Sequence, residues 1–283
     1  MAMHIGVNME FIRSQGRSFA AGVELAAQLG FHYVEPSVHD GRERLSEAGI
    51  YHSISLDEEP LEVKDVLDRY GVKPSAISAH CPLMRPEISV PYLQKAVRFA
   101  ATLGAPIVNT GEGMRPDWIS LEEARIIMRY TLMSVLRVAE RHGIMVGIEP
   151  HGSITRMTPG LLYVATLVDS PMLKINYDTG NAYLSGEDPY EALRTVGHLV
   201  GHVHAKDVPV QHTGPGHADE SRYSCACGDG VIHWGSVISI LRAAGFRGVL
   251  SVECGSPDHA ARSLAHLKPL LSKSEEALQT SEP

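Results

Sequence analysis

Four residues of the kinds that bind metal ions each close a short apolar segment in the second half of the chain. Glu149 ends IMVGIE, Asp178 ends LKINYD, His204 ends LVGHVH and Glu253 ends GVLSVE. Two glutamates, one aspartate and one imidazole make a shell of mostly oxygen atoms. Such a shell suits Mn²⁺, the metal we expect, as well as Mg²⁺, Co²⁺ or Zn²⁺. If the four segments end at one place, the sequence predicts a site for one divalent ion.

The three carboxylates of this set also indicate what the site could do. Carboxylates that meet without a cation between them repel one another, so a divalent ion is the simplest group that holds them together. A cation bound to a carbonyl oxygen stabilises the enediolate that forms when a proton leaves the neighbouring carbon. Glu149 and Glu253 could take that proton and return it. The plainer alternative is that each residue only begins a solvated loop.

The elements that must position these residues alternate along the chain. The predicted strands are 4–9, 33–36, 73–80, 105–110, 144–149, 173–178, 199–204 and 248–253. The predicted helices include 20–30, 90–104, 121–143, 158–170, 188–198, 234–245 and 257–271, where apolar residues recur at intervals of three and four. Eight strands that alternate with helices predict a single (β/α)8 TIM barrel over residues 1–273, with a polar and partly disordered tail at 274–283.

The alternative fold is a doubly wound open sheet. It usually carries a glycine-rich turn after the first strand, which GVNMEFIRSQG lacks. In a barrel the active site forms at the C-terminal strand ends, which is where the four residues lie.

The net charge, the apolar segments and the cysteines of the chain restrict its possible partners and its cellular location. A net charge of −8 over 283 residues argues against a nucleic-acid partner, which usually meets a basic face. No apolar run approaches the roughly 20 residues of a membrane span, and the N-terminus does not resemble a signal peptide, so we expect no membrane partner and a cytoplasmic protein. Four irregularly spaced cysteines predict reduced thiols. The sequence leaves the oligomeric state open, a homo-oligomer included.

Other polar residues near the predicted strand ends are candidate substrate contacts. They are His80, His151, Asn181, Lys206, Glu35 and Asn109. Lys206 could offset substrate charge, whereas Glu35 and Asn109 could hydrogen-bond sugar hydroxyls. The alternatives are an ion pair of Lys206 with Asp207 and ordinary helix capping. His202 should lie one layer deeper than His204. The glycine-rich segment 207–230 is expected to form a lid.

The motifs GIEPHG, NYDTGN, GHVHAKD, GDGVIHW and SVECG, in this order and spacing, resemble those of the xylose isomerase-like barrels. That group includes ketose 3-epimerases, hydroxypyruvate isomerases, inosose dehydratases and, more distantly, endonuclease IV. The resemblance implies that Glu149, Asp178, His204 and Glu253 bind one catalytic metal and that the two glutamates act as acid and base. Many relatives carry histidine where this chain has Asn181, so the family's usual substrate contact is altered here.

Several functions fit the resemblance. The leading one is a metal-dependent isomerase or epimerase acting on a keto-sugar or related polyol. A lyase is the runner-up, because the same base and metal serve elimination from an inosose or a 3-keto glycoside. A DNA-repair endonuclease is opposed by the acidic charge and by Asn109, where that family is expected to place a histidine. A binding protein is disfavoured because all four ligand positions are intact.

Overall fold

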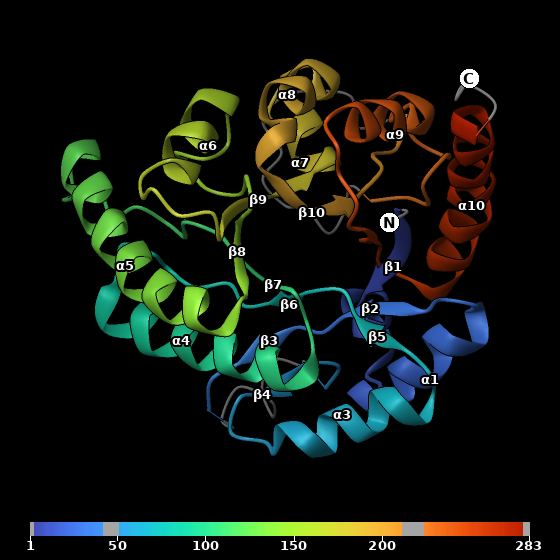
Figure 1. Ribbon diagram of the computed structural model, residues 1–283, viewed down its shortest axis with the longest axis horizontal. Helices are drawn as coiled ribbons and strands as arrows, with labels where there is room; N and C mark the ends of the chain where they lie inside the picture. The colour runs from blue at the N-terminus through green and yellow to red at the C-terminus, as the bar shows by residue number, and fades with distance from the viewer. Residues whose placement is uncertain (1–2, 42–50, 211–223, 280–283) are drawn as a thin grey trace.

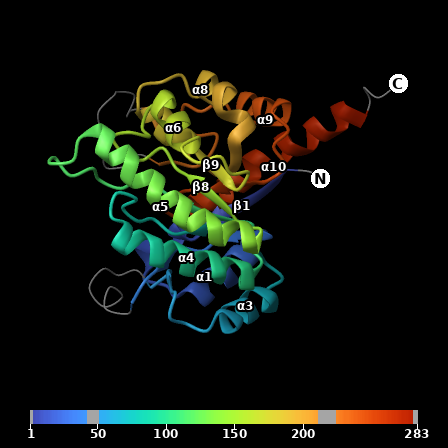
Figure 2. The ribbon, with the colours of Figure 1, turned by 60° about the vertical axis from the view of Figure 1, so that its left-hand side comes forward.

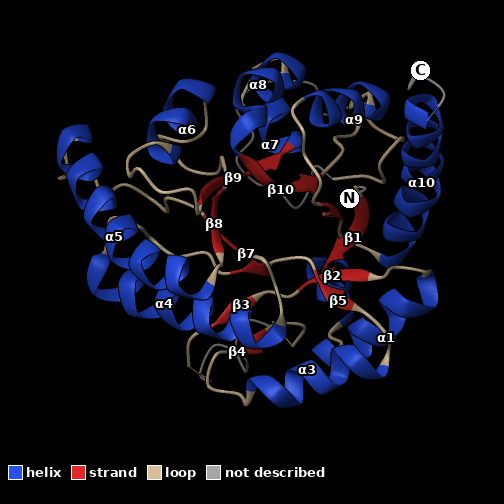
Figure 3. Cartoon of the chain, viewed as in Figure 1, coloured by secondary structure: helices blue, strands red, loops and turns tan. Residues whose placement is uncertain are grey.

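The computed structural model describes residues 3–41, 51–210 and 224–279. Within these residues one parallel sheet of nine strands runs in the order β5-β2-β1-β11-β10-β9-β8-β7-β6 and curls into a nearly closed ring (Figure 3). Its strands are β1 (His4–Asn8), β2 (Tyr33–Glu35), β5 (Lys73–Pro74), β6 (Ile77–Ser78), β7 (Ile107–Thr110), β8 (Met145–Ile148), β9 (Leu173–Asp178), β10 (Val200–Ala205) and β11 (Val249–Val252). The predicted single (β/α)8 barrel is confirmed.

Helices surround the ring of strands (Figure 1). They are η1 (Met9–Gln15), α1 (Phe19–Leu29), α3 (Pro60–Arg69), α4 (Pro86–Leu103), α5 (Leu121–His142), α6 (Thr158–Ala165), α7 (Thr179–Leu184), α8 (Pro189–Val196), η2 (Gly197–Leu199), α9 (Trp234–Ala243) and α10 (Pro257–Gln279). Helices α4 and α5 pack side by side (Figure 2). Among the described residues, none of the helices has both the length and the apolar character to cross a bilayer.

Helix α5 shows how the local sequence determines where a helix begins and ends. Ser120 Oγ accepts a hydrogen bond from Glu123 N at 3.2 Å, and Glu123 Oε2 accepts one from Ser120 N at 2.8 Å. This reciprocal pair satisfies two backbone donors at the helix start. The helix ends at Gly143, whose φ of 67° favours glycine. Met128 and Leu132, four residues apart, are buried on the face toward the core.

The predicted strand 73–80 is divided into β5 and β6. β5 pairs with β2, and β6 pairs with β7. Pro74 has no backbone N–H to donate, which favours a break in the ladder at this point. An isolated parallel bridge between Ser37, just after β2, and Ser78 of β6 closes the ring. The nine strands within the described ranges therefore fill eight barrel positions.

Other elements differ from the sequence prediction. A two-stranded parallel sheet of β3 (Val38–His39) and β4 (Ile54–Ser55) lies outside the ring, and the sequence analysis named neither it nor α3 and α7. Helix α10 extends to Gln279, so residues 274–279 are helical where a disordered tail was predicted. The segment SEEALQ contains good helix formers, which explains the extension. Residues 280–283 lie outside the described part of the chain.

Candidate metal centre

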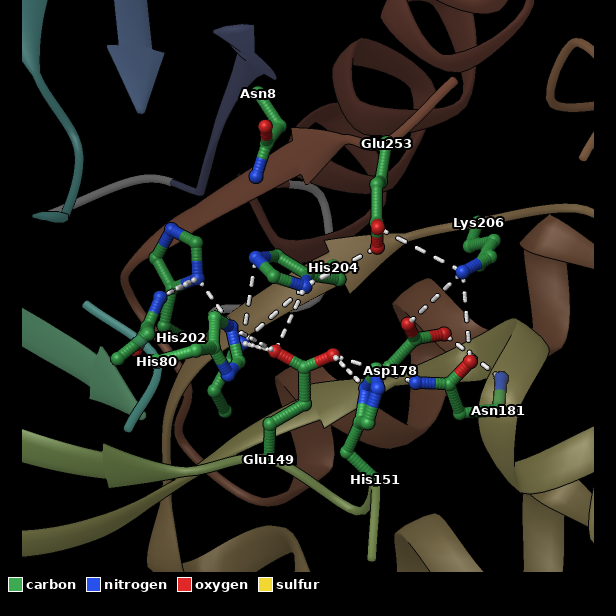
Figure 4. A network of polar contacts seen from close by, with 12 residues as sticks. Asn8, His80, Glu149, His151, Asp178, Asn181, His202, His204, Lys206 and Glu253 are labelled. Atoms are coloured by element: carbon green, nitrogen blue, oxygen red, sulfur yellow. Dashed lines mark hydrogen bonds and ion pairs between the residues drawn. The ribbon is translucent and has the colours of Figure 1, made fainter. Parts of the chain in front are cut away.

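The four predicted ligands meet at the C-terminal end of the strands. Glu149 follows β8, Asp178 ends β9, His204 lies near the end of β10 and Glu253 follows β11. The strand register pairs His204 directly with Asp178. One possible ligand atom from each of the four residues lies within 4.8 Å of the others. Figure 4 shows the four side chains turned toward a common centre, and we call them the ligand cluster.

His204 lies between two groups of carboxylates. Its Nδ1 is 3.3 Å from Glu149 Oε2 and 3.2 Å from Glu253 Oε2. Its Nε2 is 3.0 Å from each carboxylate oxygen of Glu35. Burial would lower the pKa of this imidazole, but the negative charges of Glu35, Glu149 and Glu253 outweigh burial and raise the pKa well above its ordinary value. Without a metal ion the ring is therefore a cation among carboxylates.

The carboxyl groups of the cluster differ in charge. Burial raises the pKa of Asp178 well above its ordinary value, although the Lys206 ammonium opposes this shift. Burial also works against the ionised form of Glu253, but Lys206 and His204 lower the pKa of Glu253 to about 2. In the same way, His204 overcomes burial and holds the pKa of Glu149 well below its usual range. Two carboxylates are thus ionised, and additional positive charge would allow Asp178 to ionise as well.

Two carboxylate oxygens of the ligand cluster are suited to binding a cation at its centre. Asp178 Oδ2 and Glu253 Oε2 are buried and accept no well-aligned hydrogen bond from the described residues, although His204 Nδ1 forms an ion pair with Glu253 Oε2 at 3.2 Å. The Lys206 ammonium comes no nearer than 3.8 Å to Asp178 Oδ2. Leaving a buried polar atom without a partner costs about 1–3 kcal/mol. Oxygen ligands with one imidazole nitrogen are a suitable donor set for a divalent ion, which would satisfy both atoms.

A second group of polar side chains lies directly beneath the cluster. The register places His202 beside Asn176, two residues before His204 and Asp178 on the same strands. Asn176 Nδ2 donates to Glu149 Oε2 at 3.0 Å, and Asn176 Oδ1 lies 3.0 Å from His202 Nδ1. The prediction that His202 lies one layer deeper is confirmed. Burial lowers the pKa of His202 to about 4, so this ring is neutral at pH 7.

Glu35 and Asn109 complete this polar layer, and both side chains are fully buried. Asn109 Nδ2 donates to Glu35 Oε1 at 2.8 Å. A Cβ atom at Gly147 would come 2.5 Å from Asn109 Oδ1, so the amide fits because that position is glycine. Burial would raise the pKa of Glu35, but His204 and His202 outweigh burial and lower it. Both residues contact protein groups here, and their contact with sugar hydroxyls stays a prediction.

The other predicted substrate contacts surround Glu149. His80 Nε2 lies 3.3 Å from Glu149 Oε2, and His151 Nδ1 lies 3.7 Å from Glu149 Oε1. Their side chains are 41% and 49% exposed, so both reach the open side of the site. Asn181 Nδ2 donates to Glu149 Oε1 at 3.3 Å, and Lys206 Nζ donates to Asn181 Oδ1 at 3.4 Å. The structure therefore brings all four together at the ligand cluster (Figure 4).

Glu112 is a buried carboxylate at this end of the barrel that the sequence analysis did not identify. Its Oε1 accepts from Ile154 N at 2.7 Å and its Oε2 from Thr155 N at 2.6 Å. A Cβ at Gly152 would lie 2.1 Å from the Glu112 side chain, so the loop packs closely on it. Glu112 thus fixes the loop that carries His151. Its position two residues after β7 is the one sequence signal that could have drawn attention to it.

Asp207 has a similar structural role at the start of the predicted lid. Its Oδ1 accepts from Val208 N at 2.9 Å and Ile232 N at 3.0 Å. Its Oδ2 accepts from Gly228 N at 2.8 Å and Trp234 Nε1 at 2.9 Å. These bonds join both ends of the segment 207–230. Residues 211–223, the middle of that segment, lie outside the described residues, so the lid stays a prediction.

Comparison with known proteins points to one family. A model of the xylose isomerase-like TIM barrels matches residues 23–270, most of the chain. Among curated relatives, inosose dehydratase of Lacticaseibacillus casei is 25% identical over 126 residues, which are 42% of this chain and 40% of that protein.

Solved structures with a similar fold cover nearly the whole chain. A D-tagatose 3-epimerase-like protein superposes with a TM-score of 0.78 at 23% identity, over 98% of this chain and all of the other. The IolI protein, crystallised with a bound zinc atom, has a TM-score of 0.73 at 18% identity, over 96% of this chain and 99% of the other. At these identities the likeness shows the fold alone.

Proposed function

Because the chain belongs to the xylose isomerase-like TIM barrel family, we propose that it is a divalent-metal-dependent isomerase or epimerase acting on a keto-sugar or related polyol. The proposal depends most on the ligand cluster, where Glu149, Asp178, His204 and Glu253 converge and the buried Asp178 Oδ2 has no hydrogen-bond partner among the described residues. One Mn²⁺ ion is the proposed cofactor, because three of the four ligands are carboxylates. The zinc atom in the IolI crystal structure supports a divalent ion in this fold.

The chemistry follows from the two glutamates of the cluster. A divalent cation supplies stabilisation for the negative charge that develops on substrate oxygens when a proton leaves the adjacent carbon. Glu149 and Glu253 lie within 3.3 Å and 3.2 Å of His204 Nδ1. Both have lowered pKa values, so each can begin as a base. We assign proton removal to one glutamate and proton return to the other, which must first take up a proton from solvent; a proton returned to a different face or carbon makes the reaction an epimerisation or isomerisation.

The side chains around Glu149 are the proposed substrate contacts. His80 and His151 are half-exposed beside it, and either imidazole can hydrogen-bond a hydroxyl or carbonyl group. Asn181 and Lys206 lie on the other side of the site, where Lys206 places a positive charge between Asp178 and Glu253. A small polar molecule fits this arrangement. A cytoplasmic location is part of the proposal and is supported by four free cysteines.

A lyase of the same family is the second candidate. Inosose dehydratase is among the relatives that match part of the chain. Elimination needs the same base and the same cation, but the carbanion carbon does not regain a proton. Instead the neighbouring carbon loses its substituent, a hydroxyl group that leaves as water or, in a 3-keto glycoside, the aglycone that leaves as an alcohol, and a carbon–carbon double bond forms. The substrate would then be an inosose or a 3-keto glycoside.

Deuterium exchange tests both candidates. The metal-free protein, the Mn²⁺-loaded protein and a chelator-treated sample are incubated in D₂O with ketoses, inososes and 3-keto glycosides, and the products are followed by NMR. We expect exchange at one carbon that disappears with chelator and returns with Mn²⁺. A product with inverted configuration or a moved carbonyl supports the isomerase, whereas an unsaturated product supports the lyase. Exchange that survives complete removal of metal contradicts the proposal.

A further inference from the structure

The two nitrogens of His204 have different surroundings. Nδ1 lies 3.3 Å from Glu149 Oε2 and 3.2 Å from Glu253 Oε2, so it faces the centre of the ligand cluster. Nε2 lies 3.0 Å from both oxygens of Glu35, on the opposite side of the ring. A neutral imidazole can bind a cation through one nitrogen only if its proton is on the other. The cluster therefore requires the proton of His204 on Nε2, where Glu35 accepts it.

Glu35 is itself held in position by the polar layer. Asn109 Nδ2 donates to Glu35 Oε1 at 2.8 Å, and Gly147 leaves the space that the Asn109 amide occupies. Glu35 belongs to β2, whereas His204 belongs to β10. The contact therefore joins two strands that are not neighbours in the sheet. Since both side chains are buried, no solvent molecule can easily replace this carboxylate as the acceptor.

We propose that Glu35 is a positioning residue that holds His204 with its proton on Nε2, so that Nδ1 binds the metal ion. This inference rests on the proposed metal site. A carboxylate that accepts from a metal-binding imidazole fixes the orientation of the ring and makes the other nitrogen a better ligand. Glu35 acts through His204 in this view and contacts neither metal nor substrate.

A second metal site is the competing explanation of the same residues. Glu35, His202 and His204 each offer a ligand atom within 4.8 Å of the others, and His202 Nε2 has no hydrogen-bond partner among the described residues. We prefer the positioning role because one imidazole would otherwise have to bridge two cations. The three side chains are also at most 2% exposed, which leaves little access for an ion.

Metal affinity is the first test. Mn²⁺ binding is measured by the electron paramagnetic resonance signal of the free ion, for the wild-type protein, Glu35→Gln and Glu112→Gln. Glu112 is the matched control, because it is an equally buried glutamate whose carboxylate accepts hydrogen bonds from Ser153, Ile154 and Thr155. We expect Glu35→Gln to weaken Mn²⁺ binding by about 10–100-fold and Glu112→Gln to bind as the wild type does. Equal affinities for Glu35→Gln and wild type overturn the inference.

The protonation of His204 is the second test. In the Zn²⁺-loaded, ¹⁵N-histidine-labelled protein, long-range ¹H–¹⁵N spectra report which ring nitrogen carries the proton; the His204 signals are assigned by their loss in His204→Gln. We expect a single Nε2–H form in the wild type and a mixture of forms in Glu35→Gln. If Glu35→Gln does not fold, Asn109→Ala removes the donor that orients Glu35 and should weaken Mn²⁺ binding by a smaller factor.

The outcomes separate this inference from the proposed function. A wild-type protein that binds no divalent ion contradicts both. A wild-type protein that binds one ion, together with a Glu35→Gln variant of unchanged affinity and unchanged His204 spectrum, contradicts only the role of Glu35. Two ions per chain, one of which is lost in His202→Asn, would make Glu35, His202 and His204 a metal site and would also overturn the positioning role.

Discussion

Two kinds of buried carboxylate lie at the same end of this barrel. Glu112 and Asp207 accept hydrogen bonds from N–H groups at both carboxylate oxygens. Asp178 is fully buried and the Glu253 side chain is 22% exposed, yet each has one buried oxygen that accepts no well-aligned hydrogen bond from the described residues. The first pair is satisfied by the fold, whereas the second pair has only the ion pairs with His204 and Lys206 and is the pair for which we propose a divalent cation. Hydrogen-bond partners, and not burial, therefore separate the carboxylates that fix loops from those that we propose bind a metal ion.

The largest expected effect that tests this difference is a loss of activity in Asp178→Asn. Asparagine keeps the side-chain size and can still accept from Asn181 N, which Asp178 Oδ1 does at 2.9 Å to cap α7. The charge that binds the cation is lost. Deuterium exchange in the presence of Mn²⁺ should fall about 1,000-fold, because several kcal/mol of charge stabilisation disappear at about 1.4 kcal/mol per tenfold change in rate.

The stability of metal-free Asp178→Asn shows whether the substitution itself disturbs the fold. Without metal, Asp178→Asn should unfold in urea at the same or a higher concentration than the wild type, because a buried oxygen without a partner has been replaced. Exchange at the wild-type rate would show that Asp178 does not hold the cation. A large loss of metal-free stability would place Asp178 with Glu112 and Asp207 instead.

Asp207→Asn should do the opposite of Asp178→Asn: it should destabilise the fold and leave Mn²⁺ binding unchanged. The amide group replaces one acceptor with a donor, which leaves N–H groups such as Trp234 Nε1 or Gly228 N without a partner. The free energy of unfolding should fall by about 2–4 kcal/mol, while affinity for Mn²⁺ stays unchanged. Urea denaturation measures the first quantity and a Mn²⁺ titration the second. Trp234→Phe removes only the indole donor and should cost less. An Asp207→Asn variant that binds Mn²⁺ more weakly but has an unchanged free energy of unfolding would contradict the structural role of Asp207.

The smallest predicted effect is a pH dependence of the metal-free protein. Burial raises the pKa of Asp178 in the folded state, so its contribution to stability is present at low pH and is lost as the pH rises from about 4 through the raised pKa. Relative to Asp178→Asn, the wild type should therefore lose unfolding free energy on going toward neutral pH. One proton accounts for at most about 1.4 kcal/mol per pH unit. Parallel pH profiles of the two proteins would refute a raised pKa of Asp178.

The ligand cluster could be predicted because two simple regularities combine. Strand side chains alternate, so His202 and His204 face the same side, and barrel sites form where strands end. Both regularities can be seen in the sequence. The polar layer was harder to predict, since Glu35 and Asn109 also end strands but point inward beneath the ligands. Their partners come from distant parts of the chain, and spacing along the sequence does not reveal such contacts.

The sequence analysis also missed a structural carboxylate, a helix and a small sheet, each for a different reason. Glu112 and Glu149 both follow a strand, but only the packed loop at Ile154 and Thr155 makes Glu112 structural. Helix α3 has Pro60 in its first turn with Val63 and Leu67 buried four residues apart, a signal that the sequence does contain. The β3–β4 pair joins two parts of the connection between β2 and α3, and no periodicity predicts this pairing.

The third barrel strand is divided into β5 and β6, and the sheet is weakly paired at this point, which we call the seam of the ring. In the order of the sheet, β5 and β6 are the two ends, although they follow each other along the chain, and among the described residues an isolated bridge between Ser37, just after β2, and Ser78 of β6 closes the ring. β10, which carries His204, is the middle strand of that order. Local opening begins where the fewest backbone hydrogen bonds must break. We therefore expect local opening to begin at this seam, on the far side of the ring from β9 and β10, which carry Asp178 and His204.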